Sequence, residues 1–452
     1  MRNDDTVFAL STPVGGAITV MRISGGNSLA LLSRVFTGKP SHRRVAYGRI
    51  TDEDGNTVDT CCAVYFAAPS SYTGEDMAEI SVHGSYAVAV KLTELIERTG
   101  LARKAEPGEF TKRAFLNGKM DLAEAEAVMD LISSTAERSR RAAAAQMEGA
   151  LSAVVGRIYE SAKTEAARAA NAMDDETGEA GIDTEAAAET LRALSDEAAA
   201  LAENGLKSRI LREGARVALI GSPNVGKSSL LNALILRDRA IVTAVPGTTR
   251  DTVEESASVE GLPVVFIDTA GIREAADEVE AMGVMRSVRE RDGADLVLWL
   301  IDGTREPNAA DYNAAEGVDP RKTLVVITKS DLETVIFPDA DGRFEALPAF
   351  SVSSVTGDGL TSLKKGVANA LMPSSDSRLD TEPIVTNSRH AEALFKASEK
   401  LSDAALAVRD DDLDAEFHSL RGAMGDLASI LGRDDPDEEL VNEIFSRFCL
   451  GK

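Results

Sequence analysis

The pattern of apolar and polar positions divides the chain into regions of different character. Near the N-terminus, short β-branched runs such as Ala17–Val20 and Ala63–Phe66 alternate with glycine and proline breaks. This pattern predicts an α+β domain over residues 1–118. Residues 119–211 are rich in alanine, glutamate and arginine, with apolar residues at helical spacing, so long helices are expected there. The polar run Asp174–Glu179 should break them into at least two hairpinned segments.

The pattern changes at Arg216. Short continuous apolar runs follow, mostly separated by helical stretches: Val217–Ile220, Val264–Ile267, Leu296–Ile301 and Leu324–Ile327. Continuous runs are typical of strands covered on both faces, so residues 212–373 should form an α/β domain with a mostly parallel sheet. Helical character returns over residues 374–452. The α/β domain is therefore expected to be an insertion, with the two helical parts packing as one domain.

The composition fits a soluble protein of several domains. At 452 residues the chain is too long for one core, and 44% apolar with 27% charged residues excludes wholesale disorder. No apolar run approaches the roughly 18 residues that cross a bilayer, and the N-terminus does not have the pattern of a secretory signal. The three cysteines include an adjacent pair, so no disulfide framework is indicated, and a cytoplasmic location is expected.

The net charge is strongly negative. With 49 basic and 74 acidic residues it amounts to −25. Such a balance repels a phosphate backbone at long range. If the substrate is a nucleic acid, a more basic partner protein should provide much of the binding to it.

One segment has the pattern of a phosphate-binding loop. Residues Gly221–Ser228 fit G-x-x-x-x-G-K-[ST], directly after an apolar run and before a helical one. The glycines let the backbone curl so that its N–H groups face phosphate oxygens. Lys227 should neutralise the β and γ phosphates, and Ser228 should ligate magnesium. The alternative is a glycine-rich strand-to-helix turn without a ligand.

Three further motifs in order favour a Ras-like GTPase. Asp268–Gly271 closes one predicted strand, which places Asp268 beside magnesium and the Gly271 amide near the γ-phosphate. Thr328–Asp331 closes another, and Asp331 can accept from N1–H and the exocyclic amine of guanine, a pairing that adenine cannot offer. Ser353 and Ser354 suit the loop that lies behind the guanine base. Thr328 stands where such motifs usually have Asn.

The catalytic group for hydrolysis cannot be chosen from residue types alone. Ile272 follows Gly271 where many such proteins have a water-orienting glutamine, and an aliphatic side chain cannot orient water. Nearby carboxylates are Asp277, Glu278 and Glu280. A solvated acidic loop is the alternative for this stretch.

Several separated motifs together resemble the MnmE (TrmE) family of tRNA modification GTPases, over the whole chain. They are Asp5–Thr6, Arg22–Gly25, Tyr72–Asp76, Phe115–Leu122, the Pro223–Asn224 pair, Gly247–Asp251 and Phe448–Lys452. The resemblance implies an N-terminal folate-binding-like domain that forms a homodimer, a helical domain and an inserted G domain. The implied GTP-binding set includes Asn224, Val225, Gly226, Lys227, Ser228, Ser229, Thr243, Ala244, Val245, Pro246, Gly247, Thr248, Thr249, Asp268, Thr269, Ala270, Gly271, Thr328, Lys329, Asp331, Ser353 and Ser354.

The resemblance also implies how hydrolysis proceeds. Family members are activated by potassium and by dimerisation of their G domains. Asn224 matches the potassium ligand, with carbonyls of Thr243, Val245 and Thr248 completing the shell, and a cation there can stabilise charge developing on the phosphates. Thr249 matches the second magnesium ligand beside Ser228. Glu280 matches the carboxylate that orients attacking water. A loop-capping amide is the alternative for Asn224.

A second site is implied at the other end of the chain. Arg22, Glu79, Lys119 and Lys452 match residues that contact a tetrahydrofolate derivative, 5-formyl- or methylene-tetrahydrofolate, which supplies one carbon. An FAD-containing partner, MnmG (GidA), completes the complex that installs an aminomethyl-type group at C5 of the wobble uridine of certain tRNAs. Cys449 is implied to reach the modification centre. From the residues alone, the four charged side chains are equally consistent with solvated surface positions, and Cys449 with a terminal thiol of no function.

Two rival functions are consistent with parts of the sequence. One is a regulatory GTPase, for example in ribosome assembly, without folate chemistry. The other is a scaffold that has lost turnover, for which Thr328 is the only indication. The N-terminal domain and the Phe448–Lys452 tail favour tRNA modification, because a ribosome-assembly switch needs neither.

Overall fold

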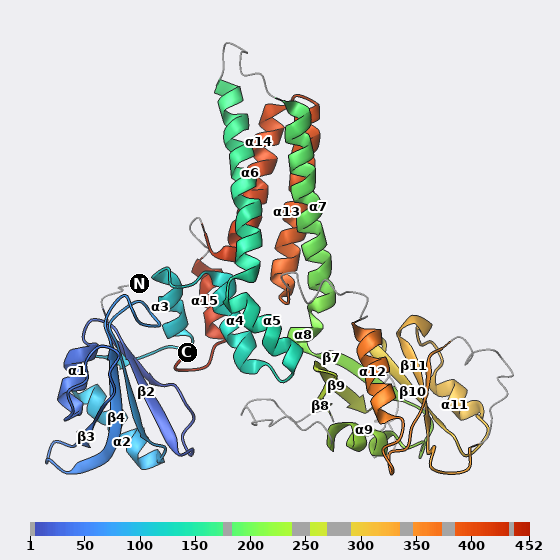
Figure 1. Cartoon of the computed structure of the whole chain (residues 1–452), viewed down its shortest axis with the longest axis horizontal. Helices are drawn as coiled ribbons and strands as arrows, with labels where there is room; N and C mark the ends of the chain where they lie inside the picture. Colours follow the sequence, from blue (N-terminus) through green and yellow to red (C-terminus); the bar gives the residue numbers. More distant parts are fainter. Residues whose placement is uncertain are drawn as a thin grey trace, which may run out of the picture. The chain divides into compact units, whose positions relative to one another are not determined.

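The computed structural model describes residues 5–174, 183–236, 254–268, 291–334, 347–372, 385–433 and 438–452 (Figure 1). The chain divides into two compact units, Met1–Met129 with Leu427–Lys452, and Asp130–Asp426. The domain boundaries expected from the sequence are not tested by this division and stay predictions. Among the helices in the described ranges, none is long and apolar enough to span a membrane.

In the described part of the first unit, six strands form one sheet in the order β3-β4-β5-β2-β1-β6. All neighbours are antiparallel except β1 and β6, which are parallel. The elements are β1 (Val7–Leu10), β2 (Ile18–Ser24), α1 (Ser28–Val35), β3 (Ala46–Thr51), β4 (Thr57–Phe66), β5 (Met77–His83), α2 (Tyr86–Arg98), β6 (Arg103–Lys104), α3 (Glu109–Leu116), α4 (Leu122–Ser133, which continues into the second unit) and α15 (Glu438–Ser446).

The alternation along these strands explains the core of the sheet. In β2, Met21 and Ile23 are fully buried, whereas Ile18 at the strand's start is 61% exposed. Side chains two apart in a strand share a face, so one face packs against apolar residues of α1 and α2. This is the α+β arrangement that the sequence predicts.

The C-terminal segment packs beside α3 and α4. Phe445 and Phe448 are buried with Leu122, and their ring centroids lie 5.2 Å apart. Gly108, with φ 69, allows close approach, because a Cβ there would lie 2.9 Å from the Cβ of Phe448. The last residues then lie against β1 and the start of α3.

The second unit contains the long helices. Its helical elements are α5 (Glu137–Met147), α6 (Ala150–Asp174), α7 (Thr184–Ser208), α8 (Ile210–Glu213), α13 (Ser388–Arg409) and α14 (Leu413–Leu431, which ends in the first unit). In Figure 1, α6, α7, α13 and α14 run alongside one another. The Ser195 hydroxyl of α7 donates to the carbonyl of Ser398 in α13 over 2.8 Å, and Arg168 of α6 pairs with the buried Glu416 of α14. Helices that precede and follow the α/β block therefore pack together.

The α/β block of the second unit has six described strands in the order β12-β11-β10-β7-β9-β8. Only the β8–β9 pair is antiparallel. The elements are β7 (Ala215–Ile220), α9 (Lys227–Leu236), β8 (Glu254–Val259), β9 (Leu262–Asp268), β10 (Leu296–Asp302), α11 (Ala309–Ala314), the 3-10 helix η1 (Pro320–Lys322), β11 (Thr323–Thr328), β12 (Ala349–Ser351) and α12 (Leu360–Leu371). The predicted mostly parallel sheet is confirmed.

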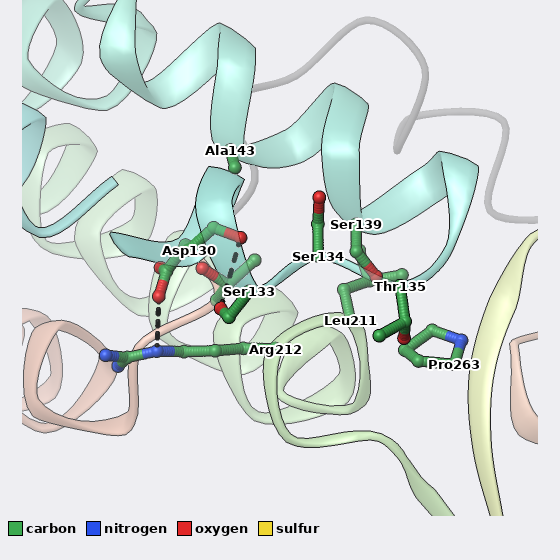
Figure 2. A pocket seen from close by; sticks show the side chains of 10 residues that line it. Asp130, Ser133, Ser134, Thr135, Ser139, Ala143, Leu211, Arg212 and Pro263 are labelled. Atoms are coloured by element: carbon green, nitrogen blue, oxygen red, sulfur yellow. Dashed lines mark hydrogen bonds and ion pairs between the residues drawn. The ribbon is translucent and has the colours of Figure 1, made fainter. Parts of the chain in front are cut away.

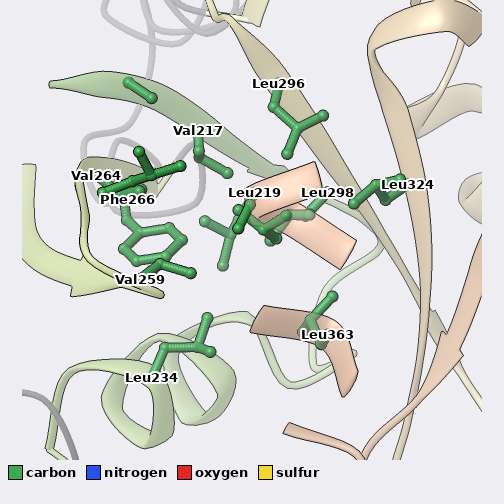
Figure 3. Close-up of a cluster of buried hydrophobic side chains, with 14 of the residues drawn as sticks. Val217, Leu219, Leu234, Val259, Val264, Phe266, Leu296, Leu298, Leu324 and Leu363 are labelled. Atoms are coloured by element: carbon green, nitrogen blue, oxygen red, sulfur yellow. The ribbon is translucent and has the colours of Figure 1, made fainter. Parts of the chain in front are cut away.

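The strands β7, β9, β10 and β11 are buried on both faces, as their continuous apolar runs predict, whereas the edge strand β12 is largely exposed. Leu219, Phe266 and Leu298 point to one side, where Leu234 of α9 and Leu363 of α12 cover them (Figure 3). Val297 and Trp299 belong to a second cluster of buried side chains.

A small polar cavity of about 30 Å³ lies where the sheet meets the helical part of the same unit. Asp130 and Arg212 form an ion pair of 2.8 Å at its wall, and Pro263 of β9 closes another side (Figure 2). Next to it, the amide of Arg138 donates to the carbonyl of Gly261 in the β8–β9 turn over 3.0 Å. The volume suits one or two water molecules rather than a ligand.

Candidate functional site

The loop between β7 and α9 has the backbone of an anion-binding curl. Gly221, Asn224 and Gly226 have φ values of 150°, 61° and 103°. A Cβ on Gly221 would lie 2.7 Å from the carbonyl oxygen of Leu300, so no larger residue fits. Alternation of such positive-φ residues with ordinary ones turns successive N–H groups toward a common centre at the start of a helix.

Lys227 lies inside this curl. Its ammonium donates to the carbonyl oxygens of Gly221 and Ser222 over 2.7 and 3.0 Å, and the residue is 9% exposed. Ser228 and Ser229 follow on the first turn of α9 and are exposed. The loop therefore holds a positive charge at its centre, with hydroxyl groups at the mouth of the helix.

A second segment of the site is the end of β11. The hydroxyl of Thr328 donates to the carbonyl oxygen of Val225 in the phosphate-loop segment over 2.7 Å and to that of Ile301 in β10 over 3.1 Å. Thr328 is 2% exposed and Val225 is 1% exposed. The expected base-reading motif is thus bonded directly to the expected phosphate loop, although the two are 103 positions apart in sequence.

Lys329 is fixed by Asp302, a partner that no motif of the sequence indicated. Its ammonium lies 2.6 Å from a carboxylate oxygen of Asp302, the last residue of β10. Burial opposes ionisation of Asp302, but hydrogen bonds from Lys329 and Thr304 hold the pKa of that carboxyl below its usual value. Asp302 is therefore ionised at neutral pH. The sequence did offer a signal, because this carboxylate ends a fully buried strand next to the expected site.

The loop after β12 completes the same edge of the sheet. Ser353 is buried, and its hydroxyl accepts from the amides of Val355 and Thr356 over 3.2 and 3.1 Å. The amide of Ser330 donates to the carbonyl of Val352 over 3.2 Å, which joins this loop to the Thr328–Asp331 segment. Asp331 and the half-buried Ser354 lie on these joined loops, with Asp331 exposed to solvent.

Arg305 is another residue of this site that the sequence did not indicate. It forms an ion pair with the fully buried Asp311, with the shortest separation 2.6 Å, and it donates to the hydroxyl of Ser222 over 3.2 Å. The indole of Trp299 donates to the carbonyl of Asp311 over 3.1 Å. This cluster anchors the start of the phosphate loop to α11. No pattern in the sequence connects Arg305 with Ser222, because the contact depends on the fold of the sheet.

In the first unit, the structure brings two of the expected folate-site residues into direct contact. Arg22 of β2 and Glu79 of β5 are register partners, and their side chains form an ion pair of 2.8 Å. The Arg22 guanidinium also lies 5.5 Å from the ring centroid of Tyr72 and 5.7 Å from that of Phe110. The sequence did not indicate these rings, although Tyr72 belongs to the Tyr72–Asp76 motif.

The C-terminal tail reaches the same place. The hydroxyl of Ser11 donates to the carbonyl of Gly451 over 3.0 Å, and an Arg22 N–H donates to it over 3.5 Å. The carbonyl of Lys452 accepts from the amide of Phe110 over 3.2 Å. Cys449 is an exposed free thiol.

Lys119 lies against the segment that carries Tyr72. Its ammonium donates to the carbonyl of Pro69 over 3.2 Å, and its stem lies beside Gly74. Among the described residues, no cluster of three or more His, Cys, Asp or Glu side chains could hold a metal ion.

Comparison with known proteins shows the family of the chain. A family model described as "MnmE helical domain" matches residues 122–449, and one described as "GTP-binding protein TrmE N-terminus" matches residues 6–119. The tRNA modification GTPase MnmE of Lactobacillus acidophilus is 37% identical over 99% of this chain and 98% of its own length. That of Roseiflexus sp. is 40% identical over 100% of both chains. The chain belongs to the MnmE family of tRNA modification GTPases.

The solved structures add little to this. The G domain of the T. maritima FeoB iron transporter is 27% identical and covers 34% of this chain, with a TM-score of 0.26. Such a score is too low to bear on the fold. Membership of the MnmE family rests on the full-length relatives and the two family models.

Several site residues expected from the MnmE resemblance lie outside the described residues. For Asp268 the structure gives the backbone position alone, paired with Leu219 at the end of β9. The expected residues outside the described ranges are Thr243, Ala244, Val245, Pro246, Gly247, Thr248, Thr249, Thr269, Ala270, Gly271 and Glu280. Their roles stay predictions.

Proposed function

We propose that the chain binds guanine nucleotides and hydrolyses GTP at the site built around Lys227, in the service of wobble-uridine modification in tRNA. The observation that carries the proposal is the hydrogen bond between Thr328 and the carbonyl of Val225. It joins the curled loop around Lys227 to the segment that carries Asp331. The bond supports a single site with a phosphate cradle and a base-reading carboxylate, as a guanine nucleotide requires.

Magnesium and potassium are proposed for this site on the chemistry of its oxygen donors. Ser228 offers an exposed hydroxyl next to Lys227, with Thr249 as the proposed second magnesium ligand. Hard cations prefer such oxygen ligands and keep several waters or phosphate oxygens. Asn224, exposed on the curl, offers an amide oxygen to potassium together with carbonyls of Thr243, Val245 and Thr248. The cation would supply positive charge near the phosphates.

Hydrolysis also needs a group that positions water, and we propose Glu280 for it. The side chain of Ile272, at the position of the usual glutamine, cannot orient water. Glu280→Ala should lower kcat while leaving nucleotide affinity nearly intact, because the carboxylate would act on water and not on the nucleotide. An unchanged kcat would remove Glu280 from the reaction.

We propose a reduced folate, 5-formyl- or methylene-tetrahydrofolate, as the ligand of the site around Arg22 and Glu79. A carboxylate such as that of Glu79 can accept hydrogen bonds from the amino and ring N–H groups of a pterin. Cationic side chains such as Lys119 and Lys452 suit the anionic tail of the folate. The rings of Tyr72 and Phe110 beside Arg22 add flat apolar surface for a bicyclic ligand. The tail would bring Cys449 to the same region.

The remaining parts of the proposal concern partners. We propose a homodimer through the N-terminal domain and a complex with an FAD-containing protein, MnmG (GidA), acting on tRNA. The net charge of −25 supports the need for a more basic partner to hold the nucleic acid. The three cysteines are free thiols, which suits a reducing cytoplasm.

One binding experiment separates this function from a regulatory GTPase without folate chemistry. Full-length protein is titrated with 5-formyl-tetrahydrofolate by calorimetry, and Glu79→Gln is the matched variant. The charged hydrogen bonds lost in Glu79→Gln should weaken binding by about tenfold or more. Absence of binding to the unaltered protein would leave GTP hydrolysis in place but remove the folate function.

A further inference from the structure

Thr328 departs from the usual Asn of its motif, and the structure shows what its hydroxyl does instead. The oxygen lies 2.7 Å from the carbonyl oxygen of Val225 and 3.1 Å from that of Ile301. Both neighbours are acceptors, and a hydroxyl has a single proton. That proton is therefore used by main-chain carbonyls of the phosphate loop and β10.

The hydroxyl has little freedom to leave this position. Thr328 is 2% exposed, and its own carbonyl accepts from the amide of Gly303 over 3.0 Å. A Cβ on Gly303 would lie 2.7 Å from that carbonyl, so the two backbones are closely packed. A β-branched side chain is also restricted in its rotation about χ1.

Guanine presents two different edges to a protein. N1–H and the 2-amino group are donors, which the carboxylate of Asp331 can accept, whereas O6 and N7 are acceptors and need a proton. An asparagine amide has two N–H protons and can bond a carbonyl and a ring acceptor together. The Thr328 hydroxyl has no second proton, and the rest of its side chain is a methyl group.

We propose that Thr328 is a positioning residue that ties the base-reading segment to the phosphate loop, and that guanine recognition in this chain does not use N7. The inference rests on the proposed function, because it assumes that Asp331 reads guanine. It deepens that function by naming which edge of the base is read and which is not.

The test uses full-length protein and four competitors against a fluorescent GDP: GTP, 7-deaza-GTP, ITP and ATP. 7-deaza-GTP lacks only the N7 acceptor, and its affinity should lie within about twofold of that of GTP. ITP lacks the 2-amino donor and should bind about tenfold more weakly, because Asp331 loses one partner. A loss of about tenfold or more for 7-deaza-GTP would overturn the inference while leaving guanine binding intact.

The proposed function fails in a different way. If ATP and ITP competed as well as GTP, Asp331 would not read the base, whatever the affinity for 7-deaza-GTP. If GTP and 7-deaza-GTP bind alike while ITP and ATP are weaker, both the function and the inference are supported.

Two variants of Thr328 separate positioning from direct reading. Thr328→Val keeps the shape and removes the hydroxyl, so affinities for GTP and 7-deaza-GTP should both fall about tenfold. Thr328→Ser keeps the hydroxyl and should stay within about twofold of the unaltered protein. A Thr328→Val protein that lost affinity for GTP alone would show that the hydroxyl reads N7, and unchanged affinity would show that it positions nothing. Should Thr328→Val fail to fold, the comparison of GTP with 7-deaza-GTP on the unaltered protein still decides.

Discussion

Replacing Gly451 by alanine should release the C-terminal tail from the first unit. Gly451 has a φ of 88°, which side chains other than glycine rarely adopt. An added Cβ would lie 2.8 Å from the Cα of Ser11, and it would overlap the carbonyl oxygen of Leu10. Both neighbours are backbone atoms of β1 and the residue after it, so no side-chain rotation relieves the overlap.

The magnitude follows from the contacts that hold the tail. Carbonyls of Cys449, Gly451 and Lys452 accept from the amide of Gly108 (3.4 Å), the hydroxyl of Ser11 (3.0 Å) and the amide of Phe110 (3.2 Å), respectively. At about 0.5–1.5 kcal/mol each, these bonds amount to about 3 kcal/mol. Positive φ alone costs alanine about 1–2 kcal/mol, and the overlap adds to this. The strain therefore matches or exceeds the energy of these three hydrogen bonds, and the last residues, Cys449–Lys452, should detach from β1 and α3.

Hydrogen exchange at the start of α3 measures this directly. The amides of Gly108 and Phe110 donate to the tail, so their exchange should become about 100-fold faster in Gly451→Ala, as expected for the loss of about 3 kcal/mol. Gly425→Ala is the matched control, because a Cβ there meets nothing within 4 Å and the residue lies within α14. The control should leave exchange at Phe110 unchanged. Equal protection of Phe110 in Gly451→Ala and the unaltered protein would refute the close approach of Gly451 to β1.

Four further measurements test the ion pairs of the first unit and the proposed nucleotide site. Arg113→Met should lower the thermal midpoint of the first unit, because Glu109, 8% exposed, keeps Arg103 but loses its second guanidinium partner, at a cost of about 1.5–3 kcal/mol. An unchanged midpoint would show that the Arg113–Glu109 pair contributes nothing. Burial opposes ionisation of Glu109, but Arg103 and Arg113 hold the pKa of its carboxyl below the usual 4.5. The contribution of ionised Glu109 to stability is therefore complete above pH 4.5 and should vanish as the pH falls through the lowered pKa. Acid titration followed by circular dichroism should show this loss of stability in the unaltered protein and less of it in Arg113→Met. Asp331→Asn should bind xanthine nucleotides better than guanine nucleotides in the competition assay, and retained guanine preference would exclude Asp331 as the reader. Sodium in place of potassium should slow GTP hydrolysis sharply, and equal rates would eliminate the cation mechanism.

Local patterns predicted much of the fold. The continuous apolar runs at Val217–Ile220, Val264–Ile267, Leu296–Ile301 and Leu324–Ile327 all became buried strands of the mostly parallel sheet. Each strand is specified by its own residues, because burial on both faces requires an apolar side chain at every position. The phosphate loop was equally local, since its glycines and Lys227 are neighbours in sequence.

Contacts between distant residues could not be predicted in the same way. Arg22 and Glu79 meet because β2 and β5 pair in one particular register, and periodicity shows which face is buried but not which strand lies beside it. The same holds for Thr328 and Val225, which are brought together by the order of strands in the sheet. The break at Gly149, with φ 84°, between α5 and α6 was also not placed from the sequence. A single glycine in an alanine-rich helical pattern lowers helix propensity without fixing an end.

The measurement that tests the central claim most directly is steady-state hydrolysis of GTP and ATP by the full-length protein and by Lys227→Ala, in magnesium and potassium. The account predicts turnover of GTP, little turnover of ATP, and loss of GTP turnover in Lys227→Ala, because the charge at the centre of the curled loop would be gone. Hydrolysis of ATP at the rate of GTP, or an undiminished rate in Lys227→Ala, would contradict it.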